Sequence, residues 1–142
     1  MESSMLGFTN AHVRGSYALT GFAGANVGGV VGICHFDGNG HYTGTYTGNF
    51  AGEDGKRLVM LNRSNQGEDA IKPDGTGTIH EVEVQDGVTN EFDDDIVILH
   101  AEVIDGQMVA TEIFGLVRQA DAAGLLLTLH LKRLPDMDGA LA

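Results

Sequence analysis

The sequence predicts an all-β fold, a single antiparallel eight-stranded up-and-down β-barrel with a short N-terminal helical turn. Three observations predict this fold. Apolar and polar residues alternate with period two along most of the 142-residue chain, as in strands that bury one face. Turns that contain glycine separate the alternating runs, and no run has the periodicity of a long amphipathic helix. Closing the strands into a barrel removes free edges; a two-sheet sandwich is the alternative.

The expected elements follow one another with short connections. The helical turn is expected within residues 8–15, where Thr9 or Asn10 would cap it and Gly15 would stop it. The eight strands are expected at residues 15–21, 27–36, 41–50, 56–64, 76–85, 95–104, 107–118 and 124–134.

The connections carry characteristic turn sequences. FDGNGH (36–41) and IDGQ (104–107) indicate tight hairpins, because Gly, Asn and Asp tolerate a positive φ. KPDGTG (72–77) places Pro at the second position of a turn. QADAAG (119–124) indicates a somewhat longer connection, and the acidic DGVTNEFDDD (86–95) is the longest expected irregular stretch.

Length and composition indicate one domain over residues 1–142, with a core at about 8–134 and a flexible tail at 135–142. The 8 basic and 20 acidic residues give a formal net charge of −12, which disfavours nucleic acid and anionic membranes as partners. Cys34 is the only cysteine, and neither a secretory leader nor an apolar span is recognised, so a reducing, cytoplasmic location is expected.

Hairpin geometry assigns side chains to the two faces of the sheet. Counting outward from the Asp-Gly bend of IDGQ places Leu99 opposite Glu112. The same count through QADAAG places Phe114 opposite Leu129. These side chains share a nearly apolar face, which is expected to be the interior. Glu112 is then a carboxylate surrounded by leucine and phenylalanine.

The other hairpins are expected to bring histidines inside as well. Pairing Phe36 with His41 turns His35 inward, together with Tyr42 and Tyr46, and leaves Cys34 outside.

In the strand expected at 76–85, His80 shares a side with Val82 and Val84 and is therefore expected inside. Glu81 and Glu83 are expected to point outward.

These interior groups predict acid–base chemistry. A lone buried carboxylate is costly unless it is paired or protonated, and both conditions are found at acid–base sites. The expected catalytic residues are Glu112, His35 and His80. The expected ligand-binding residues are Tyr17, Tyr42, Tyr46, Asn62, Leu99, Phe114, Leu129, Arg118 and Arg133. The alternative is a structural network in which Glu112 is tied to Arg or Tyr and catalyses nothing.

Neither a metal nor a cofactor is expected. Alternation separates His80 from Glu81 and Glu83, and the glycine-rich stretch 21–29 follows no phosphate-binding pattern. A homodimer is one possible assembly, through apolar residues expected on the outer face: Ile96, Ile98, Ile113, Val117 and Leu126.

The segments RGSYALTG, FDGNGHYTGTYTGN, KPDGTGTI and LHLKRL resemble a group of small bacterial proteins with lipocalin-like and allene-oxide-cyclase-like barrels. The resemblance covers about residues 8–134 and is carried by turns and strands, so it bears on the fold, a calycin-like barrel. The chain has no Trp and therefore lacks the Gly-x-Trp motif of lipocalins. Relatives of such barrels include carriers of hydrophobic molecules and cofactor-free cyclases, isomerases and lyases.

The expected function is therefore cofactor-independent isomerisation, cyclisation or elimination of a small hydrophobic, oxygenated molecule held in the barrel. A non-catalytic carrier of such a molecule is the alternative, and a structural dimer module is a third class.

Overall fold

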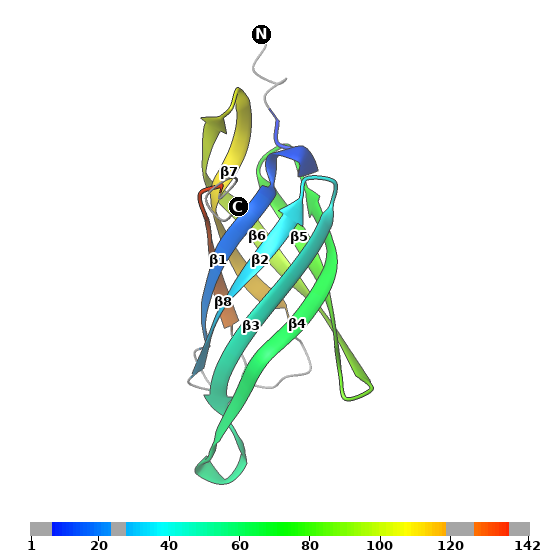
Figure 1. Cartoon of the computed structure of the whole chain (residues 1–142), viewed down its shortest axis with the longest axis vertical. Coiled ribbons are helices and arrows are strands. Elements are labelled where there is room, and N and C mark those ends of the chain that lie inside the picture. The colour runs from blue at the N-terminus through cyan, green and yellow to red at the C-terminus, as the bar shows by residue number, and fades with distance from the viewer. Residues whose placement is uncertain (1–6, 24–27, 119–126, 137–142) are drawn as a thin grey trace.

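A computed structural model describes residues 7–23, 28–118 and 127–136. The strands form one closed barrel in the order β1 to β8, in which each strand is antiparallel to the next and β8 pairs with β1 (Figure 1). The all-β, up-and-down, eight-stranded prediction is confirmed. The strands are β1 (Arg14–Ala23), β2 (Gly28–Asp37), β3 (His41–Ala51), β4 (Arg57–Ile71), β5 (Thr76–Gln85), β6 (Val88–Ile104), β7 (Gln107–Arg118) and β8 (Leu127–Arg133).

The expected helical turn is a short 3-10 helix, η2 (Asn10–His12), which Thr9 precedes as its cap. The Thr9 N–H donates to His12 Nδ1 at 2.9 Å. Gly15 belongs to β1 and does not end the turn. A second turn, η3 (Glu53–Gly55), lies in the connection between β3 and β4. No helix among the described residues is long and apolar enough to cross a membrane.

Two strands are longer than expected. β4 continues to Ile71, and β6 begins at Val88. The expected irregular stretch 86–95 is therefore wrong. Asp86 and Gly87 both have positive φ and form a tight turn, after which the acidic residues continue the strand. The Asp105–Gly106 turn is of the same kind, as its sequence indicates.

The β2–β3 register differs from the expected one by one residue. Phe36 pairs with Tyr42 and not with His41, because Asp37 Oδ1 accepts hydrogen bonds from Asn39 N and His41 N inside the loop. A shift of one residue exchanges the two faces of a strand. His35 is therefore exposed.

The position of Cys34 follows from the same shift. The thiol is buried in the barrel, so its expected position on the outer face is wrong. Burial raises its pKa well above the ordinary value.

The β7–β8 register is shifted in the same way. Phe114 pairs with His130 and not with Leu129, so the inner face of β7 carries Ile113 and Val117. Two of the expected inner residues of β7, Glu112 and Phe114, lie on the outer face, and Phe114 is 40% exposed. The connection that sets this register, residues 119–126, lies outside the described residues, as do the predicted start of the last strand at 124 and most of the tail at 135–142.

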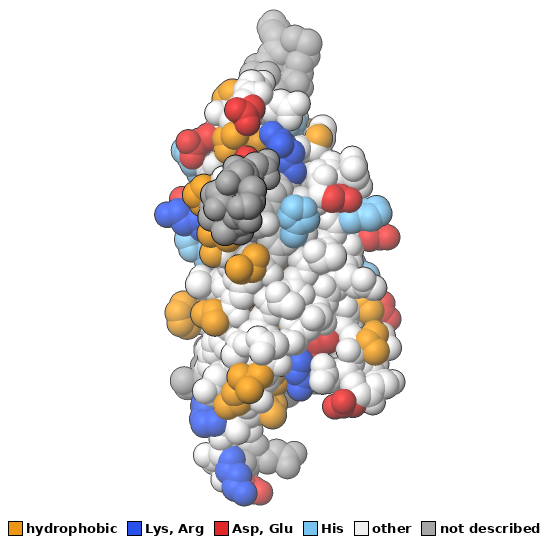
Figure 2. Space-filling view, viewed as in Figure 1, with side chains coloured by type: hydrophobic (Ala, Val, Ile, Leu, Met, Phe, Trp, Pro, Cys, Tyr) orange, Lys and Arg blue, Asp and Glu red, His pale blue; other side chains and the backbone are white. Residues whose placement is uncertain are grey.

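The outer apolar cluster expected to form a dimer is also wrong. Ile96, Ile113 and Val117 are buried in the core, and Ile98 packs against it. Leu126 lies outside the described residues. Figure 2 shows outer apolar side chains in separate groups on one face of the barrel, with charged and polar surface between them.

Aromatic side chains fill the interior at one end of the barrel, which we call the packed half. Tyr17 packs edge-on against Phe36 at 5.4 Å between ring centroids, and Phe36 packs against Tyr42 at 5.2 Å. The Tyr17 hydroxyl donates to Ala110 O at 2.7 Å, which ties β1 to β7 across the interior. This packed end lies toward η2 and the β6–β7 hairpin, at the top of Figure 1.

The face assignment of β7 predicts a contrast between neighbouring residues. Ile113→Ala would leave a cavity in the core and lower the free energy of unfolding by about 3 kcal/mol. Phe114→Ala on the outer face would lower it by well under half as much. Urea unfolding of both variants measures the difference, and an equal or reversed order would contradict the described register.

Candidate functional site

The other half of the barrel is hollow. A cavity of about 400 Å³ lies toward the β3–β4 and β5–β6 hairpins. Leu58, one of its lining residues, is 51% exposed, and Asn90 is also exposed, so the cavity reaches solvent at this end. Most of the lining is apolar or aromatic. The described lining residues are Leu19, Val30, Tyr42, Tyr46, Phe50, Ala51, Leu58, Met60, Asn65, Glu81, Glu83, Asn90, Phe92, Val117, Leu127 and Leu129.

The polar groups in this interior come from three neighbouring strands. Ile79 is buried on the inner face of β5, so the alternation that follows it turns Glu81 and Glu83 inward. Asp94 is inward on β6 because it shares a side with buried Ile96. On β4, Asn65 is buried and turns inward.

Glu81 and Asp94 form a carboxyl pair that shares a proton. Both residues are buried: Glu81 is 5% exposed and Asp94 is 1% exposed. Burial, followed by the hydrogen bond with Glu81, raises the pKa of Asp94 to about 10. Burial also raises the pKa of Glu81. Ionisation of one buried carboxyl group opposes ionisation of its neighbour, so the pair favours a state with one shared proton and one negative charge.

Two further groups surround the Glu81 carboxylate. Asn65 Nδ2 donates to Glu81 Oε1 at 2.5 Å, and the Tyr42 hydroxyl lies 3.5 Å from the same oxygen. Burial raises the pKa of Tyr42 well above its ordinary value, so this hydroxyl stays protonated. Asn65 Oδ1 is buried and has no hydrogen-bond partner in the described structure.

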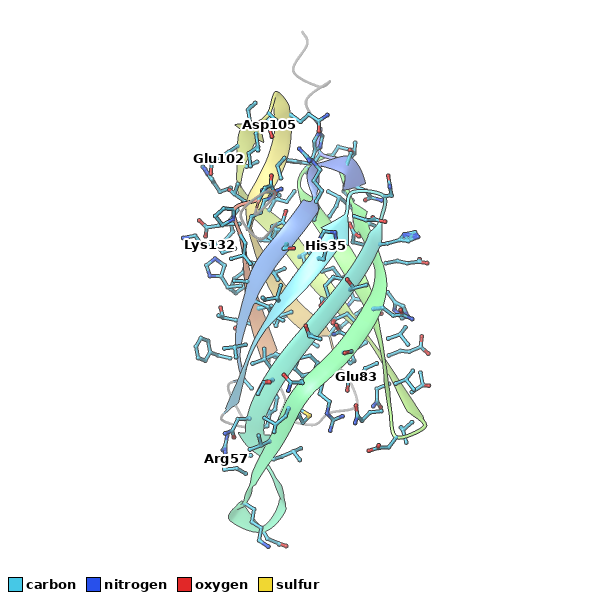
Figure 3. The ribbon with its side chains drawn as sticks, viewed as in Figure 1. His35, Arg57, Glu83, Glu102, Asp105 and Lys132 are labelled. Atoms are coloured by element: carbon cyan, nitrogen blue, oxygen red, sulfur yellow. The ribbon has the colours of Figure 1, made fainter. Side chains whose placement is uncertain are left out.

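Glu83 forms a second polar group nearer the opening, where Figure 3 labels it. The Tyr46 hydroxyl donates to Glu83 Oε1 at 2.5 Å. Arg63 NH1 lies 3.7 Å from Glu83 Oε2, and the Arg63 side chain is 24% exposed. Burial and the Glu83 carboxylate both raise the pKa of Tyr46. Both cavity tyrosines therefore donate their hydroxyl hydrogens to carboxylates.

The expected interior position of Glu112 is wrong. Glu112 lies on the outer face, where it pairs with Lys132 across β8 and accepts a hydrogen bond from His130 Nε2 at 2.9 Å. This hydrogen bond lowers the pKa of Glu112. The register shift between β7 and β8 is the physical reason.

The two expected catalytic histidines also lie outside. His35 is exposed on β2 (Figure 3), and its Nδ1 lies 3.2 Å from Ser16 Oγ. His80 bonds Asp93 at 2.7 Å through Nδ1 and Glu91 at 3.0 Å through Nε2. These carboxylates raise the pKa of His80. The expected trio of Glu112, His35 and His80 is not brought together.

Three of the expected ligand-binding residues line the cavity: Tyr42, Tyr46 and Leu129. Tyr17 is buried in the packed half, and the Arg133 side chain, which is 6% exposed, donates from Nε to Arg14 O at 2.9 Å.

The remaining four expected ligand-binding residues lie on the outer face, so their expected inward position is wrong. They are Asn62, Leu99, Phe114 and Arg118. Asn62 has a φ of 50° at a bulge between β3 and β4, which turns it outward. Arg118 pairs with Asp95 on the neighbouring strand.

Sequence reasoning missed Glu81, Glu83, Asp94 and Asn65. A signal for two of them was present: Ile79 has the same parity as Glu81 and Glu83. Val82 and Val84 favoured the opposite face as the interior, but Val84 is exposed in the structure.

Within residues 7–23, 28–118 and 127–136, no three His, Cys, Asp or Glu side chains are grouped as metal ligands. No protein-family model, curated protein or solved structure matches the chain. The site is therefore described by its own geometry, an apolar cavity whose wall includes Glu81, one member of a buried carboxyl pair.

The carboxyl pair predicts how stability changes with pH. An unfolded Asp has a pKa of about 3.9, whereas folded Asp94 keeps its proton up to a pH of about 10. Folding therefore binds a proton between these values, and this group's contribution to stability falls as pH rises. Asp94→Asn removes the effect and should raise the free energy of unfolding at pH 8 by more than about 1 kcal/mol.

Urea unfolding at pH 4, 6 and 8 measures this difference, which should shrink toward pH 4. Asp93→Asn is the matched control, because Asp93 lies next in sequence but on the outer face, and it should give no such gain. A gain for Asp94→Asn that is independent of pH would contradict the shared proton.

Proposed function

We propose that this barrel binds a small, mostly apolar molecule in its cavity. The observation that carries the proposal is the cavity of about 400 Å³, lined by apolar and aromatic side chains and open to solvent at one end. Ligand sites of this size and character bury most of a small molecule's surface. The packed half closes the other end, so a ligand would enter and leave near the β3–β4 and β5–β6 hairpins. The barrels that the sequence resembles include carriers of this kind.

The polar wall would orient the ligand's hydrogen-bonding group. Tyr42 and Tyr46 already donate to Glu81 and Glu83, so their hydroxyls are not free to polarise a ligand carbonyl. Asn65 Oδ1 is an acceptor without a partner. A ligand with a hydrogen-bond donor at its polar end fits this wall better than one with acceptors alone.

Binding of an apolar probe tests the proposal. We expect N-phenyl-1-naphthylamine, a neutral dye that fluoresces in apolar surroundings, to bind with one dye per chain. Met60→Trp places a larger side chain in the cavity and should weaken binding at least tenfold.

The matched control is Leu61→Trp, because Leu61 is the next residue and is exposed on the outer face. Fluorescence titration measures both variants. Equal binding by both variants, or no saturable binding by the wild type, would contradict a ligand in the cavity.

Acid–base catalysis on the bound molecule is the second candidate function. The specific observation that favours it is that Glu81 and Asp94 are both buried, and that Glu81 lines the cavity. Glu81 lines the cavity and would act as the base. Asp94 would remain protonated and donate a hydrogen bond to Glu81. This assignment gives Glu81 and Asp94 the roles that the sequence suggested for Glu112, His35 and His80.

A general-base probe tests catalysis without knowledge of the natural substrate. 5-Nitrobenzisoxazole is small, apolar and oxygenated, and a base opens it by removing the C3 proton as the N–O bond breaks to give a nitrile and a phenolate. We expect ring opening that is faster than in buffer alone and that saturates with substrate concentration. The absorbance of the phenolate product measures the rate.

Glu81→Gln should abolish the saturable component, while Glu68→Gln on the outer face of β4 should keep it. Undiminished ring opening in Glu81→Gln would exclude Glu81 as the base. Dye binding without any ring opening would leave the carrier function alone.

A further inference from the structure

The cavity wall carries negative charge. Glu81 and Glu83 line it, and the described lining residues include no Lys, Arg or His. Arg63 is near Glu83 at 3.7 Å, but among the described residues no basic side chain forms a salt bridge with Glu81 or Asp94. The proton that this pair shares leaves one negative charge in a site shielded from water, where an opposite charge is worth more than in solution.

An unused acceptor lies in the same wall. Asn65 is 9% exposed and lines the cavity, and its Oδ1 has no hydrogen-bond partner. The same amide donates through Nδ2 to Glu81, so Oδ1 and the Glu81 carboxylate belong to one continuous polar group. A buried acceptor without a partner costs free energy, and a donor on a ligand would recover it.

Aromatic rings form part of the surrounding wall. Tyr42, Tyr46, Phe50 and Phe92 all line the cavity. The face of an aromatic ring attracts a cation, more strongly when water is excluded. Carboxylates, a free amide oxygen and aromatic rings together form a recognition set for an ammonium group.

We infer that the cavity selects a small hydrophobic amine in its ammonium form, with the cationic group at Glu81 and Asn65 and the apolar part toward the opening. This inference deepens the proposed function and rests on it, because it requires that the cavity binds a ligand. A fatty acid would place a second negative charge beside Glu81. An alcohol would satisfy Asn65 Oδ1 and leave the charge of the carboxyl pair uncompensated. The net charge of −12 also favours the approach of a cation.

Three probes with the same alkyl chain test the inference: octylammonium, 1-octanol and octanoate. Isothermal titration calorimetry at pH 7 measures their dissociation constants with the full chain. We expect octylammonium to bind at least tenfold more tightly than 1-octanol, and octanoate to bind most weakly. A preference that survives 0.5 M NaCl would place the charge inside the cavity and not on the outer surface, because salt screens exposed charges.

Glu81→Gln should remove the preference for octylammonium over 1-octanol. Glu83→Gln is a second cavity variant in case Glu81→Gln does not fold, and it should weaken octylammonium binding in the same direction. Glu68→Gln is the matched control, because it removes the same charge from the exposed outer face of β4.

The outcomes separate this inference from the proposed function. If 1-octanol binds as tightly as octylammonium, or if Glu68→Gln removes the preference as Glu81→Gln does, the amine assignment is wrong and ligand binding stands. If none of the three probes and no naphthylamine dye binds, the cavity is not a ligand site and both proposals fail.

Discussion

Closure of the sheet by pairing β8 with β1 is the constraint on which the rest of this structure depends. Leu19 pairs with Leu131 across this seam, and no strand in the barrel is left with an open edge. Once the barrel is closed, every residue of a strand points either into one shared interior or out to solvent. The interior must then be filled, and aromatic packing around Tyr17 and Phe36 fills only one half of it. The other half remains as the cavity.

The hollow half contains groups that stability alone does not favour. A carboxyl pair, a second carboxylate and an amide oxygen without a partner occupy positions where leucine or valine would pack well. The packed half, with its apolar core and the Tyr17 hydroxyl bonded to Ala110, supplies the rigidity that such an interior requires. Buried polar groups of this kind are expected where a binding site is built into a fold.

The chain sequence predicted the architecture well and the site poorly, and local chemistry explains both. The Asp105–Gly106 turn and the turn after Pro73 need positive φ values that few other residues adopt, so strand number and order could be predicted. The β2–β3 register depends on which N–H groups of the FDGNGH loop donate hydrogen bonds to Asp37 Oδ1. The alternation of apolar and polar residues does not encode that choice. The error of one residue then reversed the faces assigned to His35 and its neighbours.

Hydrophobicity could not correct these errors, because the usual contrast between faces is weak here. Ile33 and Phe114 are apolar and exposed, whereas Glu81 and Asp94 are acidic and buried. A rule that places apolar residues inside fails where the interior is a polar-walled cavity. The barrel does bury carboxyl groups, but they belong to Glu81 on β5 and Asp94 on β6 and not to Glu112.

Cys34 gives the barrel an internal reporter of its own opening. The thiol is the single cysteine of the chain, is 1% exposed and donates to Tyr17 O beside the aromatic packing. Because burial keeps it protonated, it cannot react with a thiol reagent in the closed barrel. Its modification therefore requires the packing around it to open, and the rate of labelling measures how often this happens.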